Sequence, residues 1–378
     1  MPDVLIYADT SRSPELRHEV PLTVPDPFLY AERDGTRFAV ASSLEVPRLR
    51  ELRGLEVLAL DELGMDELIA QGMSREKISL ELSARACRHI GITNAVVPAA
   101  FPLELADHLR ANGIELQADR SFFDERRRVK TAAELAGIRR AQAAAEAGMA
   151  AARELLRRAE PNGATVMLDG GPLTCETLKA AIEQAFVEHG ATAEEFIVSH
   201  GPQSAVGHEM GSGPIAPNEP IVIDLWPRDR ESACYADMTR TFVVGEPSAE
   251  LVEWQRLCRE ALERAISEIR PGVLGRALYD GTCEIFERDG YPTQRTKEPG
   301  TVLEDGFFHG LGHGVGLEVH EDPNMGILGQ KELVAGDVVT VEPGLYRSGY
   351  GGCRLEDLVV VTEHGAENLT DFPYDLEP

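Results

Sequence analysis

The chain has 378 residues, more than one ordinary domain holds, so two hydrophobic cores are expected. Apolar residues make up 43 % of the sequence, which weighs against a disordered or low-complexity protein. The formal net charge is −27, from 37 Lys and Arg against 64 Asp and Glu, and this acidity disfavours binding to nucleic acids or anionic membrane surfaces.

The N-terminal residues show no basic start followed by a long apolar region, so they do not resemble a signal peptide. No stretch reaches the ~18 uncharged apolar residues that a membrane helix needs. The six cysteines form no CxxC pair and have no recurring interval, which favours reduced thiols over a zinc finger or a disulfide scaffold. We therefore expect a cytoplasmic protein that binds neither nucleic acid nor membrane.

Residues 1–121 alternate short β-rich runs with helical segments, which predicts a small α/β domain. A helix from Phe101 to Asn112 is indicated by Pro102 in its first turn and Gly113 just past its end. The segment has neither a glycine-rich phosphate-binding motif nor a cluster of metal-ligand residue types, so a packing or oligomerisation role is expected. The predicted strands are Val4–Tyr7, Phe38–Ala41, Leu55–Leu60 and Val96–Val97.

Residues 122–130 are predicted to be a linker between two domains. The run Arg126–Lys130 is the only dense basic patch, and on so acidic a chain we expect it to be solvated and to make local salt bridges. A long helix then begins near Thr131, which has capping-box spacing to Glu134, and it stops at Pro161. It opens the second predicted domain, residues 131–378.

Two more helices are predicted in the second domain, Thr174–His189 and Ser248–Arg270. Each has apolar residues three or four positions apart, as in Leu178, Ile182 and Phe186 of the first. This pattern indicates helices that pack over a sheet.

Four strand-like runs of the second domain carry a carboxylate where strand packing favours an apolar side chain. Burying four such groups without compensation would cost several kcal/mol each, so they are protonated, salt-bridged or bound to cations. Arg240 and Arg354 could offset two of them, whereas a pair of divalent metals could offset all four. The runs are Ile221–Asp224, Ala236–Val244 with Asp237, Val338–Glu342, and Gly351–Val361 with Glu356.

The run Phe307–His320 is rich in glycine and contains His309, His313 and His320. Its glycines alternate with other residues and match neither a dinucleotide-binding motif nor a P-loop. Because alternating glycines let another backbone approach closely, we predict a strand that presents histidine ligands on one side.

Together these residues resemble the pita-bread metallopeptidases, the family of methionine aminopeptidase, aminopeptidase P and prolidase. The resemblance covers about residues 125–378 and consists of five ligand positions in family order. It implies an α+β protein with a C-terminal pita-bread catalytic domain. The smaller N-terminal α/β domain resembles that of the prolidase, aminopeptidase P and creatinase branch.

The resemblance also implies two divalent metal ions per chain. Asp237 and Glu356 would bridge the two ions, Asp224 would chelate one, and His313 with Glu342 would complete the other. Oxygen-rich ligation with one imidazole suits Mn²⁺, which we favour, and also Co²⁺ or Zn²⁺.

Further roles follow from the same resemblance. Glu342 would carry a proton from the attacking water to the leaving nitrogen, and His208 and His320 would be catalytic histidines that contact the substrate and the tetrahedral intermediate. His309, Tyr346 and Arg354 are candidate substrate-binding residues, with packing roles as the alternative for the first two; we expect both Arg240 and Arg354 to pair with the ligand carboxylates.

The implied activity is hydrolysis of the bond between an N-terminal residue and proline, with homodimeric assembly. The compact N-terminal domain and short C-terminal region favour an Xaa-Pro dipeptidase; the alternatives are an Xaa-Pro aminopeptidase that acts on short peptides with proline at the second position, and a metal-independent creatinase-like hydrolase. One departure concerns Glu321–Asn324, where many prolidases have an arginine that captures the dipeptide carboxylate. Here Arg228, Arg230 and Arg347 are candidates for that role.

Overall fold

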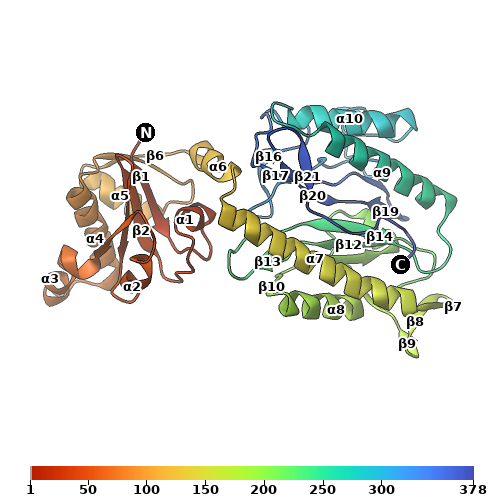
Figure 1. The fold of residues 1–378 in the computed structure, drawn as a ribbon, viewed down its shortest axis with the longest axis horizontal. Helices are drawn as coiled ribbons and strands as arrows, with labels where there is room; N and C mark the ends of the chain where they lie inside the picture. The colour runs from red at the N-terminus through yellow and green to blue at the C-terminus, as the bar shows by residue number, and fades with distance from the viewer. Residues whose placement is uncertain (1) are drawn as a thin grey trace. The chain divides into compact units, whose positions relative to one another are not determined.

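The computed structural model describes residues 2–378, which divide into two compact units, one ending at Arg127 and the other comprising Arg128–Pro378 (Figure 1). The unit boundary falls inside the predicted linker, most of which belongs to helix α6 (Arg120–Arg128). The expectation of a solvated basic run is wrong for Arg128 and Lys130. Arg128 is buried against Asp337, with Nη2 2.8 Å from Oδ2, and the Lys130 side chain is only 4 % exposed.

The first unit is a six-stranded mixed sheet in the order β4-β3-β2-β1-β5-β6, with one hydrophobic cluster on each face. The four predicted strands are all present, while β2 and β6 were not predicted. The strands are β1 (Val4–Ala8), β2 (Phe28–Arg33), β3 (Thr36–Ala41), β4 (Leu55–Ala59), β5 (Asn94–Val97) and β6 (Glu115–Ala118). The helices are α1 (Pro14–Glu19), α2 (Val46–Leu49), η1 (Leu60–Leu63), α3 (Met65–Ala70), α4 (Arg75–Ile90) and α5 (Leu103–Ala111).

Four long helices frame the second unit: α7 (Ala132–Arg158), α8 (Cys175–Glu188), α9 (Ala249–Glu268) and α10 (Gly275–Arg288). The predicted capping box starts α7: the Glu134 amide donates to Thr131 Oγ1 at 3.2 Å, and the Thr131 amide donates to Glu134 Oε2 at 2.8 Å. Figure 1 shows α7 and α8 on one side of the strands and α9 and α10 on the other. The strands of this unit are therefore enclosed by two helix pairs.

Two principal sheets lie between these helices. One has the order β11-β12-β14 and the other β16-β15-β17-β20-β21, and an isolated bridge between Thr239 and Glu356 joins them. Their strands are β11 (Ile197–His200), β12 (Ile221–Leu225), β14 (Met238–Phe242), β15 (His313–Gly314), β16 (Glu321–Asn324), β17 (Val338–Val341), β20 (Asp357–Val361) and β21 (Ala366–Asn368). Smaller pairings involve β7 (Glu160–Asn162), β8 (Thr165–Leu168), β9 (Gly171–Pro172), β10 (Ala191–Thr192), β13 (Arg228–Asp229), β18 (Gly344–Arg347) and β19 (Gly351–Arg354), with the short helix η2 (Gly201–Ala205) after β11.

Hydrophobic clusters hold each sheet against its helices. Ile182 and Phe186 of α8 pack with Ile223 of β12, while Trp254 of α9 and Phe286 of α10 belong to a cluster with the strands of the second sheet. Because both sheets are covered, their central strands β12, β14, β17 and β20 are wholly buried, and a charge on them is buried as well.

The predicted histidine-presenting strand at Phe307–His320 is wrong in extent, since β15 contains only His313 and Gly314. The glycines nevertheless permit close backbone approach. A Cβ at Gly312 would lie 2.1 Å from the Thr340 carbonyl oxygen, and one at Gly314 would lie 2.2 Å from that of Asp322. The run therefore turns sharply while it stays pressed against its neighbouring strands.

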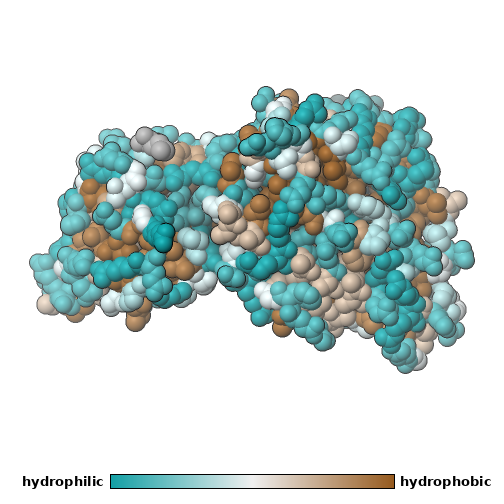
Figure 2. Space-filling model, in the orientation of Figure 1, coloured by the Kyte–Doolittle hydropathy of each residue, from teal (hydrophilic) through white to brown (hydrophobic). Residues whose placement is uncertain are grey.

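The face of the molecule drawn in Figure 2 is mainly hydrophilic, with apolar side chains in scattered patches. Among residues 2–378, no helix combines the length and apolar character needed to cross a membrane.

Candidate metal centre

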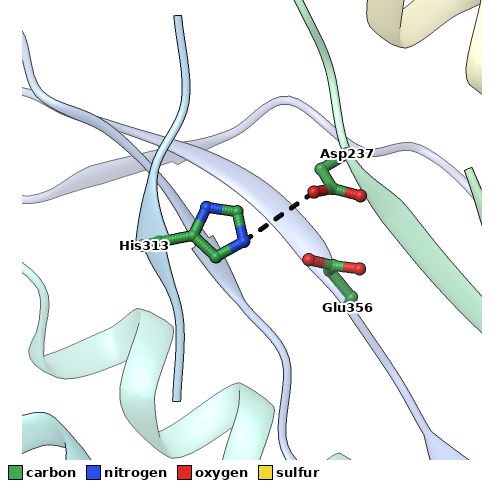
Figure 3. A group of neighbouring side chains, drawn as sticks. All are labelled: Asp237, His313 and Glu356. Carbon is green, nitrogen blue, oxygen red and sulfur yellow. Dashed lines mark ion pairs between the residues drawn. The ribbon is translucent and has the colours of Figure 1, made fainter. Parts of the chain in front are cut away.

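Asp237, His313 and Glu356 converge from three different strand segments. Asp237 directly precedes β14, His313 opens β15, and Glu356 lies between β19 and β20. One ligand atom from each lies within 4.8 Å of the others, and Figure 3 shows the imidazole directed toward the two carboxylates. The isolated β-bridge between Thr239 and Glu356 explains why Asp237 and Glu356 lie close together. It places Glu356 opposite Thr239, which is two residues after Asp237.

Glu342 and Asp224 extend this group. Glu342 follows the last residue of β17, and its Oε1 is 3.5 Å from His313 Nε2. Asp224 of β12 pairs in register with Thr239 of β14, and its charge acts on Asp237, Glu342 and Glu356. The structure thus brings together all five residues that the sequence singled out.

Electrostatics make the group unfavourable without added cations. Burial raises the pKa values of Asp237 and Glu356 well above their ordinary values, and repulsion from the neighbouring carboxylates raises them further. Burial likewise raises the pKa of Glu342 to about 7, against the opposing pull of Arg354. Burial lowers the pKa of His313 to about 3, so its ring is neutral at pH 7 and has a lone pair to offer.

The residues present fit divalent metal ions. Asp224 Oδ1 and Asp237 Oδ1 are buried and have no hydrogen-bond partner among the described residues. Buried polar atoms in native proteins are rarely left unpaired, so an unpaired carboxylate oxygen aimed into an acidic cluster points to an ion. Four carboxylates and one neutral imidazole are a donor set that suits Mn²⁺, Co²⁺ or Zn²⁺.

Arg354 and Thr239 connect the carboxylates to one another. Arg354 Nη2 pairs with Asp224 Oδ2, and its Nε donates to Thr239 Oγ1 at 3.2 Å. Thr239 in turn donates to Glu356 Oε2 at 2.6 Å. The expected pairing of Arg354 with a candidate ligand is therefore present. Thr239 was missed, although it lies two residues after Asp237 on the same side of a strand, which was the available signal.

His309 and Tyr346 lie beside Glu342. The Tyr346 hydroxyl is 2.9 Å from His309 Nε2 and accepts a hydrogen bond from Arg354 Nη1 at 3.0 Å. His309 Nδ1 is 3.8 Å from Glu342 Oε2, and burial lowers the pKa of His309 to about 3. Both residues are thus next to the carboxylate cluster.

His320 and His208 are exposed, unlike the rest of the group. The rings of His320 and His313 are 4.2 Å apart between centroids, in an edge-on arrangement. Burial, and then the charge of His208, lower the pKa of His320, so the two exposed histidines are electrostatic neighbours. They occupy the solvent-accessible side of the group.

Arg240 does not pair with a candidate ligand carboxylate, and that expectation is wrong. Its Nη2 is 2.9 Å from Asp357 Oδ1, and its Nη1 donates to the backbone oxygen of Glu356 at 2.8 Å. Successive side chains of a strand point to opposite faces, so Arg240 and Asp357 face away from the side that Thr239 and Glu356 share.

Two of the three arginines considered for capture of a substrate carboxylate have other contacts. Arg347 Nη1 is 2.7 Å from Glu250 Oε1, and Arg228 lies over the ring of Tyr235 at 5.6 Å. Arg230 is exposed. The segment Glu321–Asn324 forms β16.

Comparison with known proteins places the chain among metallopeptidases. The model of metallopeptidase family M24 matches residues 136–363. An Xaa-Pro dipeptidase of Pyrococcus furiosus is 36 % identical over 204 residues, 52 % of this chain and 53 % of the relative. A probable dipeptidase of Mycobacterium tuberculosis is 31 % identical over 204 residues, 52 % of this chain and 50 % of the relative. These alignments span about half the length of the curated relatives.

Solved structures share the whole fold. A prolidase from Pyrococcus furiosus superposes with a TM-score of 0.75 at 23 % identity, covering 99 % of this chain and 97 % of that one. An X-Pro aminopeptidase from Thermotoga maritima gives a TM-score of 0.77 at 23 % identity, covering 98 % and 96 %. The predicted α+β class with a pita-bread domain is confirmed. The match covers more than half of the chain, so the chain belongs to metallopeptidase family M24.

Proposed function

We propose that this protein is a dinuclear metal-dependent peptidase that hydrolyses the bond between an N-terminal residue and proline, with Xaa-Pro dipeptides as its main substrates. The observation that carries the proposal is the convergence of the buried carboxylates of Asp224, Asp237 and Glu356 with the half-buried Glu342 and a neutral imidazole. Two of the carboxylate oxygens have no hydrogen-bond partner among the described residues. The substrate class is supported by the relative from Pyrococcus furiosus, which is named an Xaa-Pro dipeptidase.

Five residues would hold the ions. Asp224, Asp237, His313, Glu342 and Glu356 would be their ligands, with Mn²⁺ favoured over Co²⁺ and Zn²⁺. When bound, such ions lower the pKa of a coordinated water and polarise the carbonyl of the scissile bond. The four carboxylates supply the negative charge that holds two divalent ions in a buried site.

Glu342 is the proton carrier in this proposal. Its side chain is 17 % exposed, compared with 12 % for Asp224 and 6 % for Asp237, so it is the most accessible of these three carboxylates. A carboxylate at the open side of the site can accept a proton from the attacking water and deliver it to the leaving proline nitrogen.

His320 and His208 are placed to act on the substrate from the solvent side. Because its pKa is lowered, His320 is neutral near pH 7 and can donate one N–H to the oxygen on which charge develops. His309 and Tyr346, which hydrogen-bond to each other next to Glu342, are the adjoining candidates for contact with the substrate. Arg354 holds Asp224, and Thr239 holds Glu356, so both carboxylates are kept in place.

A second candidate is Xaa-Pro aminopeptidase activity on longer peptides. The observation that favours it is the segment Glu321–Asn324 directly after His320, which contains no cationic side chain to capture a dipeptide carboxylate. The homodimer is supported by the family resemblance, and the cytoplasmic location by the six cysteines, which have neither zinc-finger nor disulfide-scaffold spacing.

The test is a comparison of steady-state turnover on Ala-Pro and Ala-Pro-Ala, each with Mn²⁺, Co²⁺ and Zn²⁺. We expect kcat/KM for Ala-Pro to exceed that for Ala-Pro-Ala by at least about 10-fold, or ~1.4 kcal/mol, with Mn²⁺ the most effective metal. Equal efficiency on the tripeptide would make the protein an aminopeptidase, and cleavage of neither would refute the proposed substrate class.

A further inference from the structure

The basic segment that opens the second unit is anchored in its interior. Arg128 pairs with Asp337 and donates to the Glu332 carbonyl oxygen at 2.8 Å. The Lys130 amide donates to the Gly336 carbonyl oxygen at 3.3 Å, and Lys130 Nζ pairs with Glu321 Oε1. The side chains of Lys130 and Glu321 are each only 4 % exposed. A charged pair buried this deeply next to the candidate site calls for a role.

Glu321 is the residue directly after His320 and the first of β16. Its ion pair lies against the backbone of the loop that ends at His320. A Cβ at Gly316 would lie 2.5 Å from Glu321 Oε1 and 2.7 Å from Lys130 Nζ. Lys130 and Glu321 therefore both pack against this loop at Gly316.

The strand ladder alone fixes this loop weakly. The pairing of β15 with β16 consists of His313 with Asn324 and Gly314 with Glu321, and its register shifts between His313 and Gly314. A ladder so short and irregular needs a further anchor to keep His313 and His320 in one arrangement. Buried ion pairs stabilise little relative to apolar replacements, and setting a register is their best-attested use.

We propose that Lys130 and Glu321 form a positioning pair that sets His320 against His313; as a claim about catalysis this rests on the proposed function. The pair holds the first residue of β16, so the imidazole immediately before it keeps its 4.2 Å edge-on contact with the His313 ring. Lys130 acts only through Glu321 and His320, without touching the substrate.

The chain offers a matched control on the next residue. Lys331 Nζ is 2.6 Å from Asp322 Oδ2, but these side chains are 38 % and 29 % exposed. Each pair connects a residue of β16 to a lysine, and the two pairs differ in how deeply their side chains are buried. Loss of the exposed Lys331–Asp322 pair should change the catalytic parameters little, because solvent screens the charges of this pair.

The variants are Lys130→Met and Lys331→Met, assayed on Ala-Pro with Mn²⁺. We expect Lys130→Met to lower kcat by at least about 10-fold while KM and the Mn²⁺ affinity stay within about 3-fold, since a misplaced group costs rate rather than binding. Lys331→Met should stay within about 2-fold of wild type. Equal losses in the two variants would overturn the proposal.

A double-mutant cycle separates positioning from a general structural role. In a His320→Ala background, Lys130→Met should change kcat by less than about 2-fold, because its effect passes through the missing imidazole. A loss as large as in wild type would contradict the proposal. If Lys130→Met does not fold, a variant with both Lys130 and Glu321 replaced by Leu is used in the cycle instead. It leaves no unpaired carboxylate of Glu321 in the interior.

A readout independent of turnover is the nuclear magnetic resonance spectrum of the protein with labelled histidine rings. The His320 ring signal should shift or split in Lys130→Met and stay unchanged in Lys331→Met. An unchanged His320 signal in Lys130→Met would refute the pair's role. If wild type cleaves no Xaa-Pro peptide, only the proposed function fails, and this measurement still decides the positioning claim.

Discussion

Two groups of buried charges occupy opposite faces of the same strands, and they differ in how well their positive and negative charges offset each other. On one face, Arg240 pairs with Asp357 and also donates to the backbone oxygens of Glu356, Phe372 and Pro373 at 2.8–2.9 Å. On the other face, Arg354 pairs with Asp224 and its charge also acts on Asp237, Glu342 and Glu356. Two oxygens of this group, Asp224 Oδ1 and Asp237 Oδ1, have no hydrogen-bond partner among the described residues. The first group is balanced by its own contacts, whereas the second has an excess of negative charge that the proposed divalent cations would offset.

The alternation of side chains along β14 and β20 explains how two such different groups can be neighbours. Thr239 and Arg240 are consecutive, as are Glu356 and Asp357, so each face receives one member of each pair. The structural pair therefore supports the same strands that carry the site. Changes on the two faces should accordingly have different consequences.

The largest expected effect comes from the unbalanced face. Glu342→Gln keeps the shape of the side chain but removes its charge and its ability to take up a proton. We expect kcat to fall by about 10³-fold or more, equivalent to ~4 kcal/mol, with an unchanged circular dichroism spectrum. Glu363→Gln, at an exposed position after β20, is the matched control and should keep full activity. Near-normal turnover of Glu342→Gln would remove this residue from the mechanism.

The balanced face should respond in stability. Arg240→Met leaves Asp357 buried and uncompensated, so the free energy of unfolding of the metal-free protein should fall by about 3–5 kcal/mol in urea titrations. Replacing Asp357 by Leu in the same chain should restore most of the loss, because no buried charge then remains. A decrease below about 1 kcal/mol for the single variant would show that the pair is not the support described.

The pH dependence of stability sharpens the comparison further. Burial raises the pKa of Glu342 to about 7 from an ordinary value of 4.5, so the metal-free fold loses stability as pH rises between these values. Glu342→Gln mimics the protonated form and lacks this loss. Its free energy of unfolding should match wild type near pH 4 and exceed it by about 3 kcal/mol at pH 8.

Saturating Mn²⁺ should abolish that advantage of Glu342→Gln, because bound cations stabilise the ionised carboxylate of wild type. A difference between the two proteins that does not vary with pH would contradict the shifted pKa. Urea unfolding at a series of pH values measures it directly.

The smallest expected effect concerns Thr239, which links Arg354 to Glu356. Thr239→Val removes both hydrogen bonds, so the dissociation constant for Mn²⁺ should rise by about 10-fold, or ~1.4 kcal/mol, in calorimetric titrations. Thr241→Val is the control, since this equally buried threonine bonds only to the Arg354 backbone among the contacts described. Equal changes in the two variants would show that Thr239 has no special link to the metal ligands.

How far the site could be predicted from sequence depended on how local the signal was. A carboxylate within or at the end of an apolar strand-like run is visible in the sequence, and Asp224, Asp237, Glu342 and Glu356 were singled out in this way. The family and fold prediction is confirmed by the match to M24 and by the shared architecture. Ion pairs between residues far apart in the sequence were harder to predict.

Two errors illustrate that limit. Arg240 was assigned to a ligand carboxylate because sequence does not show which of two adjacent acidic residues faces it; strand alternation gives it Asp357. Lys130 was expected in solvent because its partner Glu321 is 191 residues away. The formal net charge likewise does not show where acidic residues gather in the fold. The four site carboxylates are a small part of the 64 acidic residues.

The most direct test of the central claim, that the acidic group around His313 is completed by cations, is the metal content of the protein. The chain should be stripped with a chelator, reconstituted with Mn²⁺, freed of unbound metal and analysed by mass spectrometry. This account predicts about two ions per chain for wild type and for Arg240→Met, if it folds, because Arg240 serves the other face. A content near zero in wild type would contradict it.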